Sequence, residues 1–139
     1  MKICIVIANY YPKISKQLIK GASKILIRKV VKKYKIIYVP GIFEIPVIIS
    51  KNINKFDAFV ALGCVIKGET PHFNFISQAT TQAIMDLSVK YKKSIGNGII
   101  TCLNKKQALT RSNPSGKNKG GEAAKAAISV FGILKNDSK

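Results

Sequence analysis

Residues 3–8 have the sequence Ile-Cys-Ile-Val-Ile-Ala, an uninterrupted apolar run rich in β-branched side chains. Three further short runs of the same kind occupy residues 36–39, 59–62 and 99–102. None of the four alternates polar with apolar residues, and a continuous apolar strand is typical of a sheet that is covered on both faces. We therefore expect four parallel strands with helices on both sides of the sheet.

The segments between these runs show helical spacing. Over residues 15–34 apolar side chains recur every three or four positions, while lysines step by four along the other side. Helices are also expected over residues 43–53, 73–92, 104–112 and 124–134. This alternation predicts an α/β protein, a flavodoxin-like three-layer αβα sandwich with a four-stranded parallel sheet. The 139 residues contain no internal repeat or linker, so we expect a single domain over residues 1–139.

Composition excludes several classes of protein. The longest uncharged apolar run, residues 58–66, is half the roughly 18 residues that a membrane span needs. The three cysteines, Cys4, Cys64 and Cys102, are odd in number and widely spaced, which indicates neither a disulfide framework nor a zinc site. Residues 1–8 faintly resemble a secretory signal, but the apolar stretch is short and no small-residue cleavage site follows, so we expect this segment to form the first strand. We expect a cytoplasmic protein with no metal and no membrane partner.

The net charge of +18 raises the alternative of a nucleic-acid-binding module. However, 22 of the 24 basic residues are lysine, and the chain also contains 22 Ile and 9 Asn. Such a composition is typical of a codon bias, and readers of nucleic acid favour arginine. We therefore expect no specific nucleic-acid partner, although the charge alone leaves that class open.

In sheets of this kind, ligands bind beyond the carboxyl ends of the strands. His72, the one histidine of the chain, follows the third apolar run and has a side chain suited to proton transfer near neutral pH. Tyr10 and Phe43 lie in neighbouring loops, where they either stack on a flat ligand or join the core. Glu44 either caps a helix or binds a polar ligand group. Arg111 is either a phosphate ligand or an ordinary surface residue.

The segment Lys67-Gly68-Glu69-Thr70-Pro71-His72 combines glycine, a hydroxyl and proline where a helix begins. This combination is typical both of an anion-binding helix start and of an ordinary turn. The chain has neither a Gly-x-x-x-x-Gly-Lys-[Ser/Thr] loop nor a Gly-x-Gly-x-x-Gly motif, so nucleoside triphosphates and dinucleotides are not indicated.

Three motifs together resemble those of a known family. Residues 40–46 (Pro-Gly-Ile-Phe-Glu-Ile-Pro), 61–73 and 118–124 are similar, in this order, to the signatures of the 6,7-dimethyl-8-ribityllumazine synthases of riboflavin biosynthesis. The resemblance implies condensation of 5-amino-6-(D-ribitylamino)uracil with 3,4-dihydroxy-2-butanone 4-phosphate, with release of phosphate and water and without a cofactor.

The resemblance also assigns roles to individual residues. His72 would transfer protons. The pyrimidine and its ribityl chain would be bound by Tyr10, Ile42, Phe43, Glu44, Cys64, Val65, Ile66 and Asn97. The phosphate would be bound by Glu69, Thr70, Arg111 and Lys119.

The same resemblance implies a homo-oligomer, a pentamer or a shell of 60 subunits, with active sites at subunit interfaces and a functional association with riboflavin synthase. Asn97 replaces a phenylalanine that in the family comes from the adjacent subunit. We expect Asn97 to precede the fourth strand and to reach only a neighbour's pocket. Two alternatives are a nucleic-acid-binding module and a flavin or phospho-sugar binder without catalysis.

Overall fold

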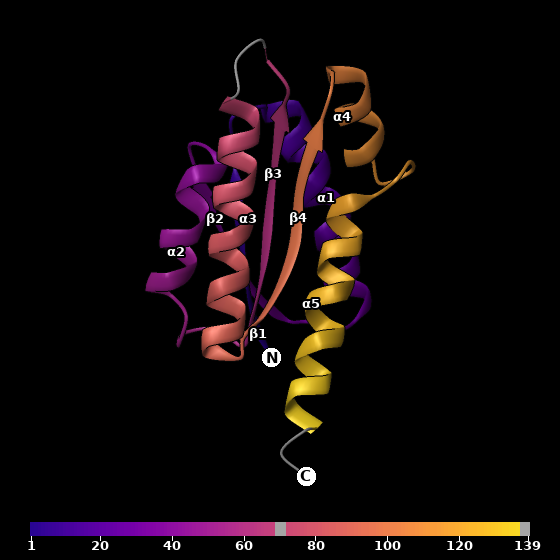
Figure 1. Cartoon of the computed structure of the whole chain (residues 1–139). Coiled ribbons are helices and arrows are strands. Elements are labelled where there is room, and N and C mark those ends of the chain that lie inside the picture. The colour runs from indigo at the N-terminus through magenta and orange to yellow at the C-terminus, as the bar shows by residue number, and fades with distance from the viewer. Residues whose placement is uncertain (69–71, 137–139) are drawn as a thin grey trace.

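The computed structural model describes residues 1–68 and 72–136, in which strands and helices alternate along the chain (Figure 1). All pairings in the sheet are parallel, with the strand order β2-β1-β3-β4. The predicted fold, a flavodoxin-like sandwich, is confirmed. The elements are β1 (Lys2–Ala8), α1 (Pro12–Arg28), β2 (Lys33–Val39), a short 3-10 helix η1 (Ile42–Glu44), α2 (Ile45–Lys51), β3 (Ala58–Ile66), α3 (His72–Tyr91), β4 (Ser94–Cys102), α4 (Lys105–Ser112) and α5 (Lys119–Asn136).

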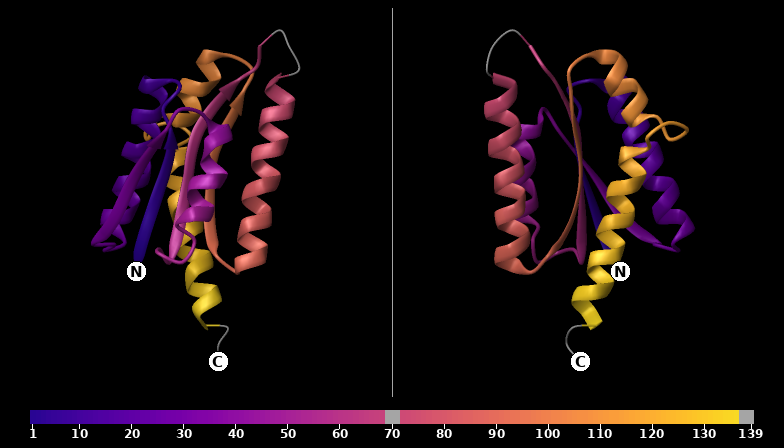
Figure 2. Two further views of the ribbon diagram at one scale, coloured as in Figure 1. Left: turned by 90° about the vertical axis from the view of Figure 1, so that its left-hand side faces the viewer. Right: turned by 45° about the vertical axis from the view of Figure 1, so that its right-hand side comes forward.

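The helices form two layers, with α2 and α3 on one face of the sheet and α1, α4 and α5 on the other (Figures 1 and 2). Strand β1 serves both layers, since Ile5 packs into the core beside α1 and Val6 into the core beside α2. Both side chains are fully buried. Burial on both faces explains why the strand is a continuous apolar run.

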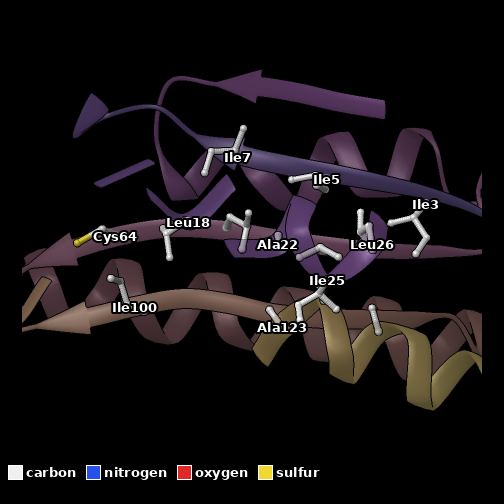
Figure 3. Close-up of a cluster of buried hydrophobic side chains, with 14 of the residues drawn as sticks. Ile3, Ile5, Ile7, Leu18, Ala22, Ile25, Leu26, Cys64, Ile100 and Ala123 are labelled. Atoms are coloured by element: carbon white, nitrogen blue, oxygen red, sulfur yellow. The ribbon is translucent and has the colours of Figure 1, made fainter. Parts of the chain in front are cut away.

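The core on the α1 and α5 side combines large β1 side chains with small helix residues (Figure 3). Ala22 of α1 and Ala124 of α5 are fully buried there. A Cβ atom at Gly120 would overlap the backbone of Leu18 in α1. The two helices therefore approach closely, and this contact sets the position of the first turn of α5.

The helix expected over residues 15–34 ends at Arg28, so its predicted end was wrong. Val30 has a φ of 60°, and the N–H of Val31 donates to the carbonyl of Leu26, which closes the last turn. All of β2 then pairs with β1. The hydrogen bonds and burial of that pairing outweigh a local helical pattern, which contains no information about a distant strand.

Strand β4 and helix α5 both begin earlier than the sequence pattern predicts, because glycines interrupt the pattern near their starts. Strand β4 begins at Ser94, so Asn97 lies inside the strand, opposite Ala61, and the expectation that it precedes the strand was wrong. A Cβ at Gly98 would lie 2.9 Å from Cβ of Ala123, so glycine is needed where α5 crosses β4. Helix α5 likewise begins at Lys119, before two glycines that weaken a helical pattern.

Within the described residues, no helix has both the length and the apolar character that crossing a bilayer requires.

Candidate active site

A cavity of about 670 Å³ opens at the carboxyl ends of β1, β2 and β3, beside the first turns of α3. We call it the strand-end cavity; in Figure 1 the arrowheads of the strands point toward this end of the molecule. It brings together eight residues that the sequence predicted for the site: Tyr10, Ile42, Phe43, Glu44, Cys64, Val65, Ile66 and His72.

Two aromatic rings from the loop after β1 line this cavity. Tyr10 and Tyr11 meet edge to face, with ring centroids 4.9 Å apart and an angle of 89° between the planes. Tyr10 is 68% exposed, whereas Tyr11 packs against the core. Ser15 anchors the loop, because its Oγ lies 2.9 Å from the carbonyl of Ala8 and 3.0 Å from that of Tyr11. The supported Tyr10 ring is well suited to stack on a flat heterocycle.

Glu44 has a structural role that the sequence left open. Its Oε1 accepts a hydrogen bond of 3.0 Å from the N–H of Gly41, and its own N–H donates to the carbonyl of Gly41. This reciprocal cap fixes the turn that presents Phe43, which is 63% exposed at the cavity. A carboxylate has two acceptor oxygens, so the cap leaves capacity for a ligand hydroxyl.

His72 is the first residue of α3 and is exposed at the cavity. Phe73, the next residue, and Ile76, one turn further along α3, complete the apolar wall. The N–H groups in the first turn of a helix have no partner within the helix and favour anions. Glu69 and Thr70, predicted as phosphate ligands, lie outside the described residues.

A second cavity of about 460 Å³ runs along β4, and we call it the edge cavity. It contains the other three predicted residues, Asn97, Arg111 and Lys119. Asn97 Oδ1 accepts a hydrogen bond of 3.0 Å from the N–H of Ile99. The Lys119 ammonium lies 3.0 Å from the carboxylate of Glu122, in a partly exposed pair of the kind that contributes little stability. A single chain thus places His72 and Arg111 in different cavities.

Two buried thiols, those of Cys64 and Cys102, belong to one core cluster near these groups. Cys64 also lines the strand-end cavity. Burial raises the pKa of Cys64 to about 12, and the neighbouring Cys102 adds to this. Burial also raises the pKa of Cys102, an effect that the nearby Arg111 guanidinium opposes. Both thiols are therefore neutral, and Cys64 contributes an apolar wall and no nucleophile.

Sequence reasoning missed several residues of the two cavities. Tyr11 was not assigned to the site, although it directly follows Tyr10. Ile76 lies four positions after His72, a helical spacing that could have placed it at the same wall. Phe73 lies three positions before Ile76 and also lines the cavity. Glu122 is a neighbour of Lys119 only because α5 begins earlier than its apolar pattern indicates. Among the described residues, no group of three His, Cys, Asp or Glu side chains is placed to hold a metal ion.

An αβα sandwich with an aromatic and polar cavity at its strand ends belongs to the class of proteins that bind small organic ligands at that edge of the sheet. Residues 1–135 match the family described as 6,7-dimethyl-8-ribityllumazine synthase, and the chain belongs to this family.

Curated relatives agree with that assignment. The 6,7-dimethyl-8-ribityllumazine synthase of Bartonella tribocorum is 45% identical over 136 residues, which cover 96% of this chain and 89% of the relative. The synthase of Zymomonas mobilis is 44% identical over 96% of both chains. That of Cutibacterium acnes is 40% identical over 96% of this chain and 82% of its own length. The predicted family is confirmed.

Proposed function

We propose that this protein condenses 5-amino-6-(D-ribitylamino)uracil with 3,4-dihydroxy-2-butanone 4-phosphate to form 6,7-dimethyl-8-ribityllumazine, releasing phosphate and water. The family assignment supports this reaction. The observation that carries it is the strand-end cavity, where an aromatic platform, a carboxylate and an imidazole from separate parts of the chain meet.

The pyrimidine would stack on Tyr10, and its ribityl hydroxyls would bind near Glu44. Cys64, Val65 and Ile66 would form the apolar wall, together with Ile42 and Phe43, all of which line the strand-end cavity. Holding two reactants in line can lower a barrier by about 7–11 kcal/mol, so binding geometry would supply much of the rate.

His72 would move the protons of the reaction. The pyrimidine amine forms an imine with the ketone, the phosphate leaves, and the second ring closes. Water leaves only after an oxygen has been protonated, and an imidazole near neutral pH can both give and take that proton. This chemistry needs one acid–base group, an anion-binding site and an aromatic platform. It needs no cofactor.

The phosphate would be held by Arg111 and Lys119, together with Glu69, through its backbone, and Thr70. Because Arg111 and Lys119 line the edge cavity and His72 lines the strand-end cavity, we propose that the complete site forms between subunits. The edge cavity of one subunit would meet the strand-end cavity of its neighbour, with Asn97 facing the neighbour's pyrimidine. Such a contact joins two different surfaces and generates a ring, and we propose a pentamer, alone or in a 60-subunit shell.

We also propose that the protein acts in the cytoplasm, since three widely spaced cysteines, an odd number, indicate no disulfide framework. A functional association with riboflavin synthase is proposed because the lumazine product must be consumed by a later step of the same biosynthesis.

The reaction is tested by mixing the two substrates with the native protein and following the absorbance of the lumazine. Formation of product supports the proposal, and no product from correctly folded oligomer rejects it. Sedimentation of the native particle separates pentamer from shell, and a monomer that is fully active would reject the shared site.

Two variants test the assignment of roles. His72→Ala should lower kcat by about 100-fold and leave the binding of a phosphate ligand unchanged, because acid–base catalysis is lost. Arg111→Ala should raise the KM for the butanone phosphate about tenfold, because a charged hydrogen-bond donor is lost. The control for the second variant is Arg28→Ala, the other arginine of the chain, at the end of α1. Parental kinetics in either site variant would contradict its role.

A further inference from the structure

A third cavity, a hollow of about 860 Å³, lies at the amino ends of β1 and β2, at the opposite end of the sheet from the strand-end cavity. The seven residues of β1 separate the two ends by about 20 Å. Five lysines line the hollow, and we call it the lysine hollow: Lys2, Lys32, Lys33, Lys35 and Lys55.

The strand register places like charges together in this hollow. Lys2 stands directly opposite Lys33 in the pairing of β1 with β2, and Lys35 follows on the same face of β2. Like charges directly opposite one another destabilise a sheet. Lys93 adds an ammonium beside the hollow, since its Nζ donates to the carbonyl of Phe56, which is one of the lining residues.

One carboxylate lies beside this hollow in the part of the chain that the structure describes. The carboxylate of Asp57 accepts a hydrogen bond from the backbone N–H of Lys2 and offsets part of the lysine charge. The lining itself contains no acidic residue, and the ion pair of Lys119 with Glu122 belongs to the edge cavity. The five lysines outnumber this one carboxylate, so the hollow keeps an excess of positive charge.

The lysine-rich composition explains how many lysines there are but not why these converge. Lys16, Lys20 and Lys24 are exposed along the outer side of α1, as a solvated helix face would be. The five lysines of the hollow come instead from β1, from β2 and the turn before it, and from the turn after α2, and they surround a concave surface. Clefts lined by one sign of charge focus the electrostatic field and concentrate counter-ions.

We propose that the lysine hollow binds an oligophosphate anion, a short chain of linked phosphates. The lysine ammonium is a compact charge with three donors and is a common phosphate ligand. A chain of three phosphates carries about four to five negative charges near neutral pH, which matches five ammonium groups. The volume lies within the range of small-molecule sites, and the amide of Asn54 supplies a further polar group. The ligand would not compete with the substrate phosphate, because the two sites lie at opposite ends of the sheet.

The test is isothermal titration of the native protein with inorganic tripolyphosphate. The double variant Lys33→Gln/Lys35→Gln removes two charges from the hollow and keeps most of each side chain. The matched control, Lys16→Gln/Lys20→Gln, removes two charges from α1. All four lysines are exposed, so folding should be preserved. We expect the dissociation constant to rise about tenfold or more in the hollow variant and less than about twofold in the control.

Thermal unfolding gives a second measurement. Without the anion, the hollow variant should be at least as stable as the parent, because repulsion is relieved. Tripolyphosphate should then raise the Tm of the parent and of the control, but not that of the hollow variant. Lumazine formation should be the same in all three proteins.

Three results would overturn the proposal. Equal weakening in both double variants would mean that the anion follows the net charge of the whole surface. Loss of binding in Arg111→Ala alone would place the anion in the edge cavity. Binding of a long single-stranded oligonucleotide without measurable binding of tripolyphosphate would indicate a nucleic-acid surface instead.

Discussion

Replacing Gly120 by alanine tests the close contact that positions α5 and, with it, the edge cavity. The new Cβ would overlap the carbonyl oxygen of Leu18, its nearest neighbour, and would lie 2.9 Å from the carbonyl carbon and 3.0 Å from the Cα of the same residue. Carbon atoms pack at about 3.5–4.0 Å, so α5 must move by about 1 Å or more from α1 to clear the oxygen as well. Overpacking of this kind costs about 1–3 kcal/mol, against which the better helix propensity of alanine returns at most about 1 kcal/mol. We expect a net loss of about 1–2 kcal/mol.

Gly132 provides a matched control on the same helix. A Cβ at Gly132 would have no heavy atom within 4 Å, so alanine fits without strain. Gly132→Ala should therefore stabilise the protein by about 0.5–1 kcal/mol through helix propensity alone. The same substitution in one helix thus has opposite expected signs at the two positions.

The assay is urea unfolding followed by circular dichroism, at one protein concentration because association affects the midpoint. Gly120→Ala should also raise the KM for the butanone phosphate, since the shift of α5 displaces the adjoining Lys119. A Gly120→Ala protein that is as stable as the parent would refute the reasoning. So would equal destabilisation by the two substitutions, because it would mean that the contact with Leu18 is not the cause.

Three further predictions concern the thiols, the edge cavity and the Tyr10 loop. Burial raises the pKa of Cys4 from 9.0 to about 11 and that of Cys64 from 9.0 to about 12. The thiols therefore ionise at lower pH in the unfolded chain than in the folded protein. As a result, the free energy of unfolding should fall as the pH rises from about 9 to 12. Urea unfolding across this range should show a smaller fall in Cys64→Ala, and an identical fall would contradict the assignment. Asn97→Phe should lower the KM for the pyrimidine severalfold, because a pair of stacked rings contributes about 0.5–1.5 kcal/mol. An unchanged KM in steady-state kinetics would argue against the proposal that residue 97 faces a neighbour's site. Ser15→Ala should lower the free energy of unfolding by about 1–2 kcal/mol and raise the KM for the pyrimidine, since the loop that presents Tyr10 loses its anchor. A variant with parental stability and the parental KM would show that the hydroxyl does not hold the loop.

Much of the fold could be predicted because its main constraint is local in the sequence. A strand that is buried on both faces must be apolar at every position, and the runs at residues 3–8 and 59–62 have this pattern. Parallel strands end at one edge of the sheet, so residues that follow them, such as Tyr10 and Glu44, were expected to meet, and they do. The predicted boundaries of elements were wrong where a distant element decided them, as at the start of β2 and at the glycines of β4 and α5.

The sequence by itself determined the parallel sheet, its two helical layers and the residues that gather at the strand ends, because burial and strand direction depend on short patterns. The tertiary structure alone decided that Arg111 and His72 line different cavities and that Cys64 and Cys102 share one core cluster. It also decided that five of the many lysines converge on one hollow. These relations join residues that are far apart in the chain, and they depend on strand order, register and the distance between helices, which no local pattern encodes.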